Sequence, residues 1–494
     1  MKMPEDLPTR HRPQAAGPSR GDGGSPRRRG LVLALMVTAQ FMVILDSSIV
    51  NVALPTIQHA LRFSPVGVEG VITAYATAFG GVLVLGGRLA DLLGYRRIFV
   101  AGLLAFALTS LACGLANAPV VLVAARVAQG LSAAVLAPAA LALLTTTFTE
   151  GAERNRALGI FGAATSLGFV SGQILGGVLA DTIGWRSIFI INVPVSALAA
   201  VLAARVIAAT TPKGERRVPD VTGAVLVTAA VALAVWAPAY GSEHGWTSVG
   251  VPAAVVAALV LLGVFVVVET RRRDPLIRLS MLRSRWFAGT GVATMVTGAL
   301  NGAVVLLCTL FLQQTRHYSP LQAGFAFVPT GLAGLLIGVK VAGPLITRLG
   351  VRAVLTGTSL LSAVAIAFLS TFPGGGGYLF LLPWLVVVGA SFTGAAVATT
   401  VAVSSGVAPD EQGMAAALRQ TAYQLGVALG VAVFLSVAAA HTGALLARPV
   451  PVDRSEALAA GYGLSLMILS VLSALGGLAA FTTLRTARRT TAAE

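Results

Sequence analysis

The sequence predicts an all-α membrane protein that crosses the bilayer fourteen times. Of its 494 residues, 56% are hydrophobic and only 11% are charged, and the mean hydropathy is +0.84. Soluble domains carry about 25% charged residues, so a water-soluble chain of this length would lack the polar surface that must cover its core. These values exclude a soluble enzyme, a nucleic-acid-binding module and a disordered chain. The two cysteines, both in apolar segments, exclude a disulfide framework and a metal cluster held by thiolates.

Apolar segments long enough to cross about 30 Å of hydrocarbon follow one another along the chain. Backbone polar groups in lipid must find partners within their own segment, so each span is expected to be a helix. In chain order, the predicted spans are 31–54, 71–87, 98–116, 120–143, 157–179, 187–208, 221–240, 250–268, 287–312, 322–343, 352–372, 378–402, 414–438 and 461–483.

The basic residues orient these spans. If the N-terminus is cytoplasmic, most of the 35 Lys and Arg residues lie in cytoplasmic tails and loops. The outer loops then hold five of them, namely Arg62, Arg186, Arg316, Arg448 and Arg454. The positive-inside rule therefore predicts that both termini are cytoplasmic. It also accounts for the net charge of +16 without a nucleic-acid partner.

An internal repeat divides the spans into two halves. Residues 87–96 (GRLADLLGYR) follow the second span, residues 343–352 (GPLITRLGVR) follow the tenth, and five of ten positions match. The spans therefore form two parallel six-helix bundles separated by an inserted pair of helices. The expected division is a disordered basic tail at 1–30, an N-terminal bundle at 31–208, the inserted pair with its linkers at 209–285, a C-terminal bundle at 286–484, and a cytoplasmic tail at 485–494.

Asp46 is the acidic residue that lies well inside a predicted span. A charged side chain at the bilayer centre costs about 2.5–3.5 kcal/mol on insertion scales, which points to a functional role. Because burial disfavours the charged form, such a carboxyl group is able to gain and lose a proton near neutral pH, as proton coupling requires. The alternative is a structural aspartate that is bonded to neighbouring helices or paired with Arg126.

Arg126 and Gln129, three residues apart, share one face of the fourth span. A buried guanidinium keeps its proton and must find an anion or other acceptors. Arg126 would either stabilise the charged form of Asp46 in one state or attract an anionic substrate. The alternative is that Arg126 extends to the outer interface, since it lies less than two turns from the end of its helix.

Two glycine-containing stretches accompany these residues. In the loop 87–97, Gly87 and Gly94 are expected to allow a tight turn, and Asp91 to cap a helix end or pair with an arginine. In the fifth span, Gly168, Gly172 and Gly176 recur at four-residue spacing and predict a smooth face for close helix packing.

The stretches 45–55 (LDSSIVNVALP), 87–97 (GRLADLLGYRR), 126–131 (RVAQGL) and 168–177 (GFVSGQILGG) together resemble the major facilitator superfamily, specifically its fourteen-helix drug:proton antiporter branch. The resemblance covers the chain from the first span to the fourteenth. It implies the major facilitator fold, in which two six-helix bundles surround a central cavity and work by alternating access.

The resemblance also implies roles for individual residues. Asp46 and Arg126 would couple transport to protons, and the loop residues Gly87, Arg88, Asp91, Gly94, Arg96 and Arg97 would latch the two halves at a cytoplasmic gate. Gly168, Gly172, Gly176 and Gly177 match the antiporter motif of exporters, although Gln173 stands where that motif has a proline. The arginines of the loop also satisfy the positive-inside rule, which is the simpler explanation for them.

Polar residues within the spans are candidates for the substrate cavity. They are Gln129, Gln173, Asn301, Gln420, Tyr423 and Gln424. The alternative for each of them is a hydrogen bond between helices that contributes only to packing.

The expected function is that of a proton-coupled antiporter that exports drugs, antibiotics or similar amphipathic molecules. No Gly-x-x-x-x-Gly-Lys-Ser/Thr motif occurs, so the energy source is an ion gradient rather than ATP. A proton that crosses about 150 mV supplies roughly 3.5 kcal/mol. The alternative is a dedicated exporter of one endogenous metabolite, such as a self-made antibiotic, a siderophore or an amino acid.

The remaining expectations concern chemistry and partners. The protein is expected not to be an enzyme and to need no cofactor or metal, with the proton-motive force as its energy source. Its expected partners are a small-molecule substrate, protons and the lipid bilayer, with no nucleic acid, and it is expected to be monomeric. It is expected in a bacterial cytoplasmic membrane.

Overall fold

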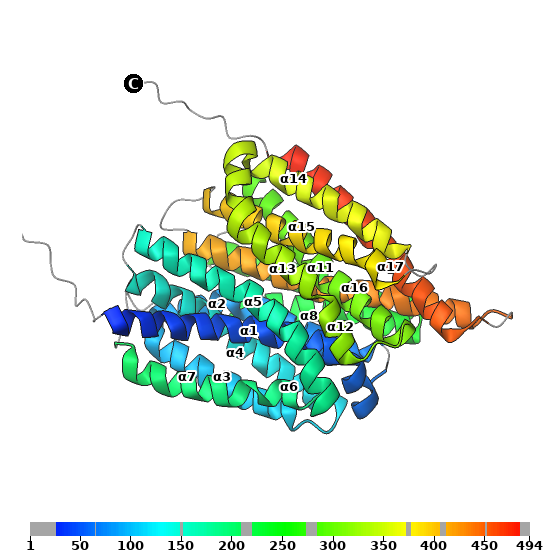
Figure 1. Cartoon of the computed structure of the whole chain (residues 1–494), viewed down its shortest axis with the longest axis horizontal. Coiled ribbons are helices and arrows are strands. Elements are labelled where there is room, and N and C mark those ends of the chain that lie inside the picture. Colours follow the sequence, from blue (N-terminus) through cyan, green and yellow to red (C-terminus); the bar gives the residue numbers. More distant parts are fainter. Residues whose placement is uncertain are drawn as a thin grey trace, which may run out of the picture.

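The computed structural model describes residues 26–64, 66–148, 152–208, 220–272, 284–371, 377–405, 412–449 and 452–484. Within these ranges the chain is helical and contains no strand (Figure 1). The elements up to residue 272 are α1 (Pro26–Leu61), the 3₁₀ turn η1 (Gly67–Glu69), α2 (Gly70–Leu93), α3 (Tyr95–Gly114), α4 (Pro119–Thr147), α5 (Ala152–Thr182), α6 (Ser187–Ile190), α7 (Asn192–Val206), α8 (Val221–His244) and α9 (Gly250–Arg271). The later elements are α11 (Arg285–Leu310), the π-helical turn η2 (Phe311–Thr315), α12 (Pro320–Ala326), α13 (Val328–Leu336), the π-helical turn η3 (Ile337–Val341), α14 (Ala342–Ser370), α15 (Tyr378–Ser405), α16 (Gln412–Leu446) and α17 (Arg454–Thr483).

Thirteen helical stretches in the described ranges are long and apolar enough to cross a membrane. The longest, Pro320–Ser370, has 51 residues and would extend about 75 Å as one straight helix. Its backbone leaves the helical conformation at Gly350, so this stretch contains two of the predicted spans, 322–343 and 352–372. Helices of the structure thus account for all fourteen predicted spans, and the protein is an all-α, multi-pass membrane protein.

The two copies of the internal repeat contain the same backbone turn. Gly94, between α2 and α3, has φ 92°, and Gly350, at the equivalent position of the second copy, has φ 83°. This left-handed region is open to glycine and strained for other residues. Gly87, which was expected to share in the turn, lies instead within α2, because the helix continues to Leu93 before the chain turns.

The first helix begins earlier than its predicted span. Pro26 opens α1, so residues 26–30, which were assigned to a disordered tail, belong to a helix. Arg28 Nε donates a hydrogen bond of 3.0 Å to the carbonyl of Val206, and Arg29 lies 3.3 Å from the carboxylate of Glu153. These contacts hold the start of α1 against the last residue of α7 and the start of α5. Residues 1–25 and the predicted tail at 485–494 lie outside the described residues.

The helices gather in two groups. In the first, α1 packs against α5, α2 against α4, and α3 against α4 and α7; in the second, α11 packs against α16, and α14 against α15 and α17. Figure 1 shows the first group (blue to teal) below the second (yellow to red). The groups meet where α2 contacts α16 and where α5 contacts α12 and α13.

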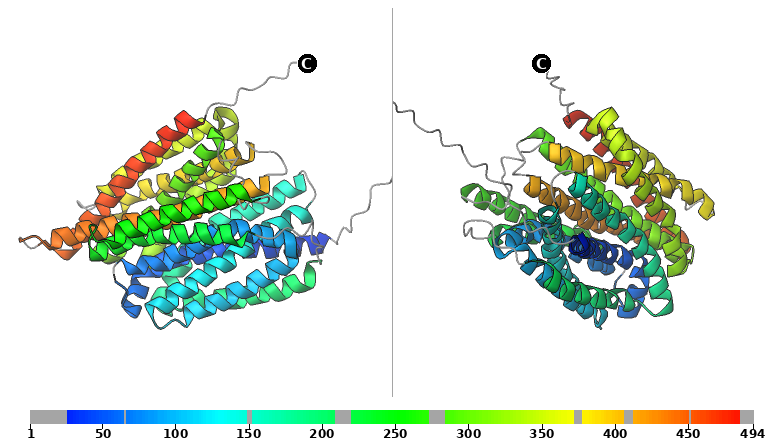
Figure 2. Two further views of the ribbon diagram at one scale, coloured as in Figure 1. Left: turned by 180° about the vertical axis from the view of Figure 1, so that it is seen from behind. Right: turned by 60° about the vertical axis from the view of Figure 1, so that its left-hand side comes forward.

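The inserted pair α8 and α9 lies against this junction. Helix α8 contacts both α2 and α16, and α9 packs on α8 (Figure 2). Helix α9 is the most apolar of the thirteen stretches, with a mean hydropathy of 2.9, and only 17% of its most apolar segment is buried. An apolar helix with so little protein around it is suited to face lipid.

The glycines of α5 permit close contact with α1. A methyl group at Gly172 would lie 2.7 Å from Cβ of Ser48 and 3.0 Å from the carbonyl oxygen of Leu45, and one at Gly176 would lie 2.7 Å from the carbonyl oxygen of Ile49. Gly168 contacts the same helix, whereas Gly177 lies against the first residues of α12. The four motif glycines therefore place α5 between α1 and the second group of helices.

We expect Gly172→Ala to lower the stability of the protein by about 1–3 kcal/mol, because the added methyl group overpacks the contact between α1 and α5. Thermal unfolding of the purified protein in detergent measures the effect. Gly162→Ala is the matched control, since a methyl group there meets nothing within 4 Å and alanine favours a helix. Equal unfolding temperatures for the two variants would show that the contact is looser than described.

Candidate functional site

A large cavity lies between the two groups of helices. Its volume is about 1920 Å³, whereas drug-sized molecules occupy pockets of roughly 300–1,000 Å³. Residues of α1, α2, α4 and α5 line one side, and residues of α11, α13, α15 and α16 line the other. The cavity is thus large enough to hold a bulky organic molecule together with water.

The cavity is open at one end and closed at the other. Its lining includes Asp91 and Arg156, which are exposed at the end of the molecule that carries the loop 87–97. At the opposite end, the lining includes Ile72 and Val305, which are buried. A molecule can therefore enter from the side of the loop 87–97, while the far side is blocked.

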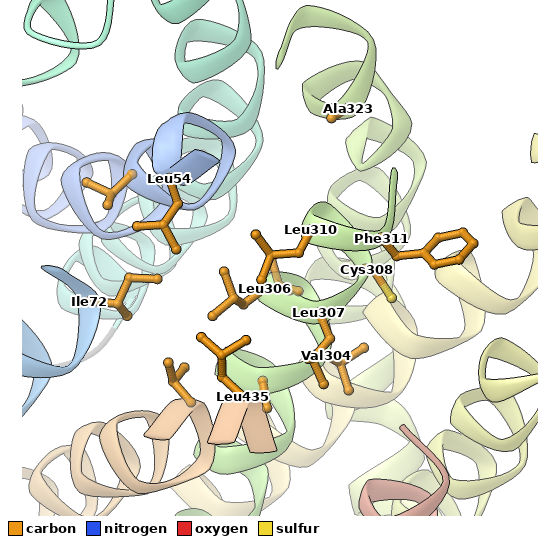
Figure 3. Close-up of a cluster of buried hydrophobic side chains, with 14 of the residues drawn as sticks. Leu54, Ile72, Val304, Leu306, Leu307, Cys308, Leu310, Phe311, Ala323 and Leu435 are labelled. Carbon is orange, nitrogen blue, oxygen red and sulfur yellow. The ribbon is translucent and has the colours of Figure 1, made fainter. Parts of the chain in front are cut away.

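An apolar cluster blocks the far side (Figure 3). Leu54 of α1 and Ile72 of α2 gather with Leu306 and Leu310 of α11 and Leu435 of α16, all less than 10% exposed. We call these five residues the apolar seal. Beside it, Gln313 Nε2 donates a hydrogen bond of 2.8 Å to the carbonyl of Val52. Side chains from both groups of helices therefore close this end together.

Asp46 and Arg126 form a buried ion pair. Arg126 Nη1 lies 2.6 Å from Asp46 Oδ2, and the side chains are 1% and 0% exposed. Two amides complete the shell of the carboxylate: Gln129 Nε2 donates to Asp46 Oδ1 at 2.8 Å, and Asn192 Nδ2 donates to the same oxygen at 2.9 Å. Charges buried in an apolar bundle need this degree of pairing, since each lone charge would be strongly destabilising.

Arg126 has further partners besides Asp46. Its Nε donates to the carbonyl of Val71 at 2.8 Å, and its Nη1 donates to Gln129 Oε1 at 2.7 Å. The guanidinium carbon also lies 4.2 Å from the ring centre of Tyr75, a distance suited to a cation–π interaction. Arg126 therefore keeps two hydrogen bonds and an aromatic face if the carboxylate becomes neutral.

The ion pair lies behind the cavity wall. Asp46, Arg126 and Gln129 are not among the lining residues, whereas Ser47 and Ser48, next to Asp46 on α1, are. The backbone of α1 therefore connects Asp46 directly to residues of the cavity wall. Gln129, expected as a substrate candidate, is instead bound to Asp46 and to Ser110 Oγ, the latter at 2.7 Å.

Sequence reasoning missed two members of this network, Asn192 and Ser110. Asn192 belongs to α7 and reaches Asp46 across 146 residues of sequence. Its sequence signal was the segment Ile191–Pro194, which resembles the antiporter branch but suggested no contact. Ser110 gave no signal, because a serine in an apolar helix is commonplace.

The loop 87–97 sits at the open end. The hydroxyl of Tyr95 donates a hydrogen bond of 2.7 Å to Asp91 Oδ1, so Asp91 binds a tyrosine four residues away. Arg96 Nη2 donates to the carbonyl of Ala204 on α7, and Arg97 is exposed. Gly87 and Arg88 line the cavity.

The other cavity candidates divide into two sets. Asn301 on α11 and Gln420, Tyr423 and Gln424 on α16 line the cavity. Gln173 does not line it: its side chain is fully buried, and neither amide atom has a hydrogen-bond partner in the described part of the chain.

The described ranges bring no three His, Cys, Asp or Glu side chains together in a way that would hold a metal ion. Cys113 and Cys308 are buried and separate, and Cys113 Sγ lies 3.4 Å from Gln129 Oε1, where it acts as a weak donor.

Known proteins resemble this chain over most of its length. The cephamycin export protein of Amycolatopsis lactamdurans is 39% identical over 415 residues, which cover 83% of this chain and 85% of that protein. The puromycin resistance protein of Streptomyces alboniger is 37% identical over 428 residues, covering 86% and 84%. The tetracenomycin C resistance and export protein of Streptomyces glaucescens is 34% identical, covering 86% and 78%.

Solved structures agree with the fold. A bacterial homologue of the human lysosomal transporter Spinster, in an inward-facing and unoccupied conformation, superposes with a TM-score of 0.70 over 93% of this chain and 98% of that one, at 15% identity. This likeness concerns the fold alone. The sequence model described as Major Facilitator Superfamily matches residues 36–431, and the chain belongs to this superfamily.

Proposed function

We propose that the protein is a proton-coupled antiporter that exports antibiotics or similar amphipathic molecules by alternating access. Membership of the superfamily makes it a transporter of small molecules rather than an enzyme. Relatives that share 33–39% of its residues are named for the export of, or resistance to, cephamycin, puromycin, tetracenomycin C and lincomycin. The large cavity is suited to molecules of this size.

The observation that most directly supports proton coupling is the ion pair between Asp46 and Arg126. Protonation of Asp46 removes the charge that attracts Arg126, and removing one partner of a buried pair typically costs about 3–5 kcal/mol. The bonds of Arg126 to Val71 and Gln129 and its contact with Tyr75 lower that cost, because the guanidinium is not left alone. The pair is thus a switch that one proton can open.

Alternating access requires the two halves to move against each other. We assign residues 31–208 and 286–484 to these halves and 209–285 to the inserted pair, because the helices of each half pack mainly among themselves. The apolar seal and the Gln313 bond close one side in this state, which we take to be the outer side. The open end, with the loop 87–97, the start of α1 and the end of α17, would then be cytoplasmic, and we assign both termini to that side of the membrane.

The remaining assignments follow from this mechanism. The protein would work as a monomer in a bacterial cytoplasmic membrane, without nucleic acid and with the proton-motive force in place of a cofactor. Each half contributes one wall of the cavity, so no second copy is needed to complete the pathway.

A dedicated export function is the second candidate. Two of the relatives, the cephamycin and tetracenomycin C proteins, are named for the export of a single antibiotic. Transport of one compound from a broad panel would favour this candidate over multidrug export.

Asp46→Asn is expected to abolish drug-induced proton release. Asparagine keeps the shape of the side chain but loses the titratable group, so the ion pair cannot form or break with a proton. Energised everted vesicles with a pH-sensitive dye measure proton movement as antibiotics and dyes are added. Asp181→Asn, which neutralises an exposed aspartate at the end of α5, is the control and should behave as the unmodified protein. Equal proton release by Asp46→Asn would assign coupling to another group.

Gln313→Ala is expected to open the outer side more often. Loss of one hydrogen bond between the halves, about 0.5–1.5 kcal/mol, shifts the population by roughly 2- to 10-fold. The shift is measured as faster labelling of Asn51→Cys, at the closed end of the cavity, by a bulky maleimide added outside. The native cysteines are buried, and protein without the new cysteine gives the background.

Gln322→Ala is the matched control for this experiment. Gln322 belongs to the same half, but its side chain accepts a hydrogen bond from the backbone of Ser319 and makes no bond to the described residues of the first half. If both variants label Asn51→Cys at the same rate as the parent, the bond between Gln313 and Val52 does not hold the outer side closed.

A further inference from the structure

An arginine lies within the cavity on the second half of the protein. Arg419 belongs to α16 and lines the cavity. It lies seven residues after Gln412, the first residue of the helix, which places it roughly 10 Å along the helix axis. The cavity is lined by a broad face of α16 that includes Arg419, Gln420, Tyr423, Gln424 and Val427.

Close packing fixes this face toward the cavity. On one side of α16, Gly298 of α11 contacts the carbonyl of Tyr423, and Gly426 contacts the carbonyl of Met295. On another side, a methyl group at Gly80 of α2 would lie 2.9 Å from Cβ of Gln424. Helix α16 therefore packs closely against both α11 and α2. It cannot rotate to move Arg419 out of the cavity unless these helices separate.

Arg419 has no carboxylate partner in the described part of the chain. The ion pairs there join Arg29 to Glu153, Arg126 to Asp46, and Arg272 to Asp220. The hydrogen bond that Arg419 makes runs from Nη2 to Gln420 Oε1 at 3.2 Å. A guanidinium has five N–H donors, so most of those of Arg419 remain available to a molecule in the cavity.

The charges that line the cavity favour a negatively charged ligand. Its charged lining residues in the described ranges are Arg88, Arg156 and Arg419 against Asp91, whose carboxylate accepts a hydrogen bond from Tyr95. The buried acid of the first half, Asp46, lies behind the wall and is bound to Arg126. The described lining therefore offers a positive site at depth and contains no membrane-embedded carboxylate that would attract a cation.

Uncharged donors surround the arginine. Gln420 and Tyr423 lie on its own helical face. Asn301 of α11 lies between the levels of Tyr423 and Val427, because Gly298 contacts Tyr423 and Gly302 contacts Val427. Amides and a hydroxyl at these positions are able to complete the shell of a carboxylate that the guanidinium binds in its fork.

We propose that Arg419 binds an anionic group, such as a carboxylate, of the transported molecule, with Asn301, Gln420 and Tyr423 as neighbouring donors. The inference rests on the proposed role of the cavity as the transport route and narrows the substrate class to anions. It separates the two tasks of the protein: Asp46 handles the proton in the first half, and Arg419 handles the substrate charge in the second.

Equilibrium binding to the purified protein in lipid nanodiscs tests the proposal. The probes are cefoxitin, which carries one carboxylate, its neutral methyl ester, and puromycin, an amine. In Arg419→Gln, cefoxitin binding should weaken roughly 10- to 100-fold, as expected for loss of one charge-assisted hydrogen bond. The ester and puromycin should change by less than about 2-fold. Arg419→Lys, which keeps the charge, should restore part of the affinity.

Matched controls separate charge recognition from folding. Arg285→Gln removes an exposed arginine outside the cavity and should bind cefoxitin as the unmodified protein does. Retained binding of the ester and puromycin shows that Arg419→Gln is folded. Equal weakening of all three probes, or unchanged cefoxitin binding, would overturn the proposal.

Two further results would also contradict it. Anionic lipid headgroups offer the same chemistry, so the measurement is repeated in nanodiscs with and without phosphatidylglycerol. Displacement of cefoxitin by phosphatidylglycerol in the unmodified protein but not in Arg419→Gln would assign the site to lipid. Failure of cefoxitin to bind the unmodified protein, while other compounds still release protons in vesicles, would refute anion recognition and leave antiport intact.

Discussion

The buried ion pair between Asp46 and Arg126 is the constraint on which the first half of the protein depends. Neither charge is tolerated alone in an apolar bundle, so α1 and α4 must stay in register at this depth. Gln129 of α4 also binds the pair, and two further helices contribute Asn192 (α7) and the carbonyl of Val71 (α2). The glycines of α5 bring that helix to backbone distance from α1 on its other side. Asp46 thus belongs to a helix that is held by the ion pair on one side and by close packing against α5 on the other.

The closed end of the cavity combines two kinds of contact, and this combination matters for a transporter. Removal from water stabilises the contact among the side chains of the apolar seal, but this stabilisation does not depend on the angle between them. The hydrogen bond from Gln313 to the carbonyl of Val52 depends on the orientation of the two halves, but it contributes only about 0.5–1.5 kcal/mol of stability. Such a closure is strong enough to exclude a solute and weak enough to open in each cycle. The polar network around Asp46, by contrast, lies within one half and can persist while the halves move.

The membrane spans and much of the candidate site could be predicted from the sequence. Fourteen spans followed from apolar length alone, and Asp46 and Arg126 stood out because charges within spans are rare. Their contact distance did not follow from spacing, since 80 residues separate them. Asn192 escaped notice because no periodicity links the start of α7 to α1. Of the two glycines expected to allow the turn, Gly94 has the left-handed backbone, whereas Gly87 continues α2, because the end of a helix depends on the backbone angles of one residue. The amide of Gln173 was expected to need partners, and in the described ranges it has none.

The placement of polar groups on opposite walls has a consequence for how such a protein can change over generations. In the described part of the chain, the side chains that meet the cavity from α11 and α16 share no hydrogen bond with the Asp46 network, whose members belong mainly to α1, α4 and α7. Substitutions at Asn301, Gln420 or Tyr423 therefore alter the shape and polarity of one wall while the charged network keeps its partners. In the proposed mechanism, the wall that meets the substrate can therefore change by single substitutions without direct change to the network that would handle the proton.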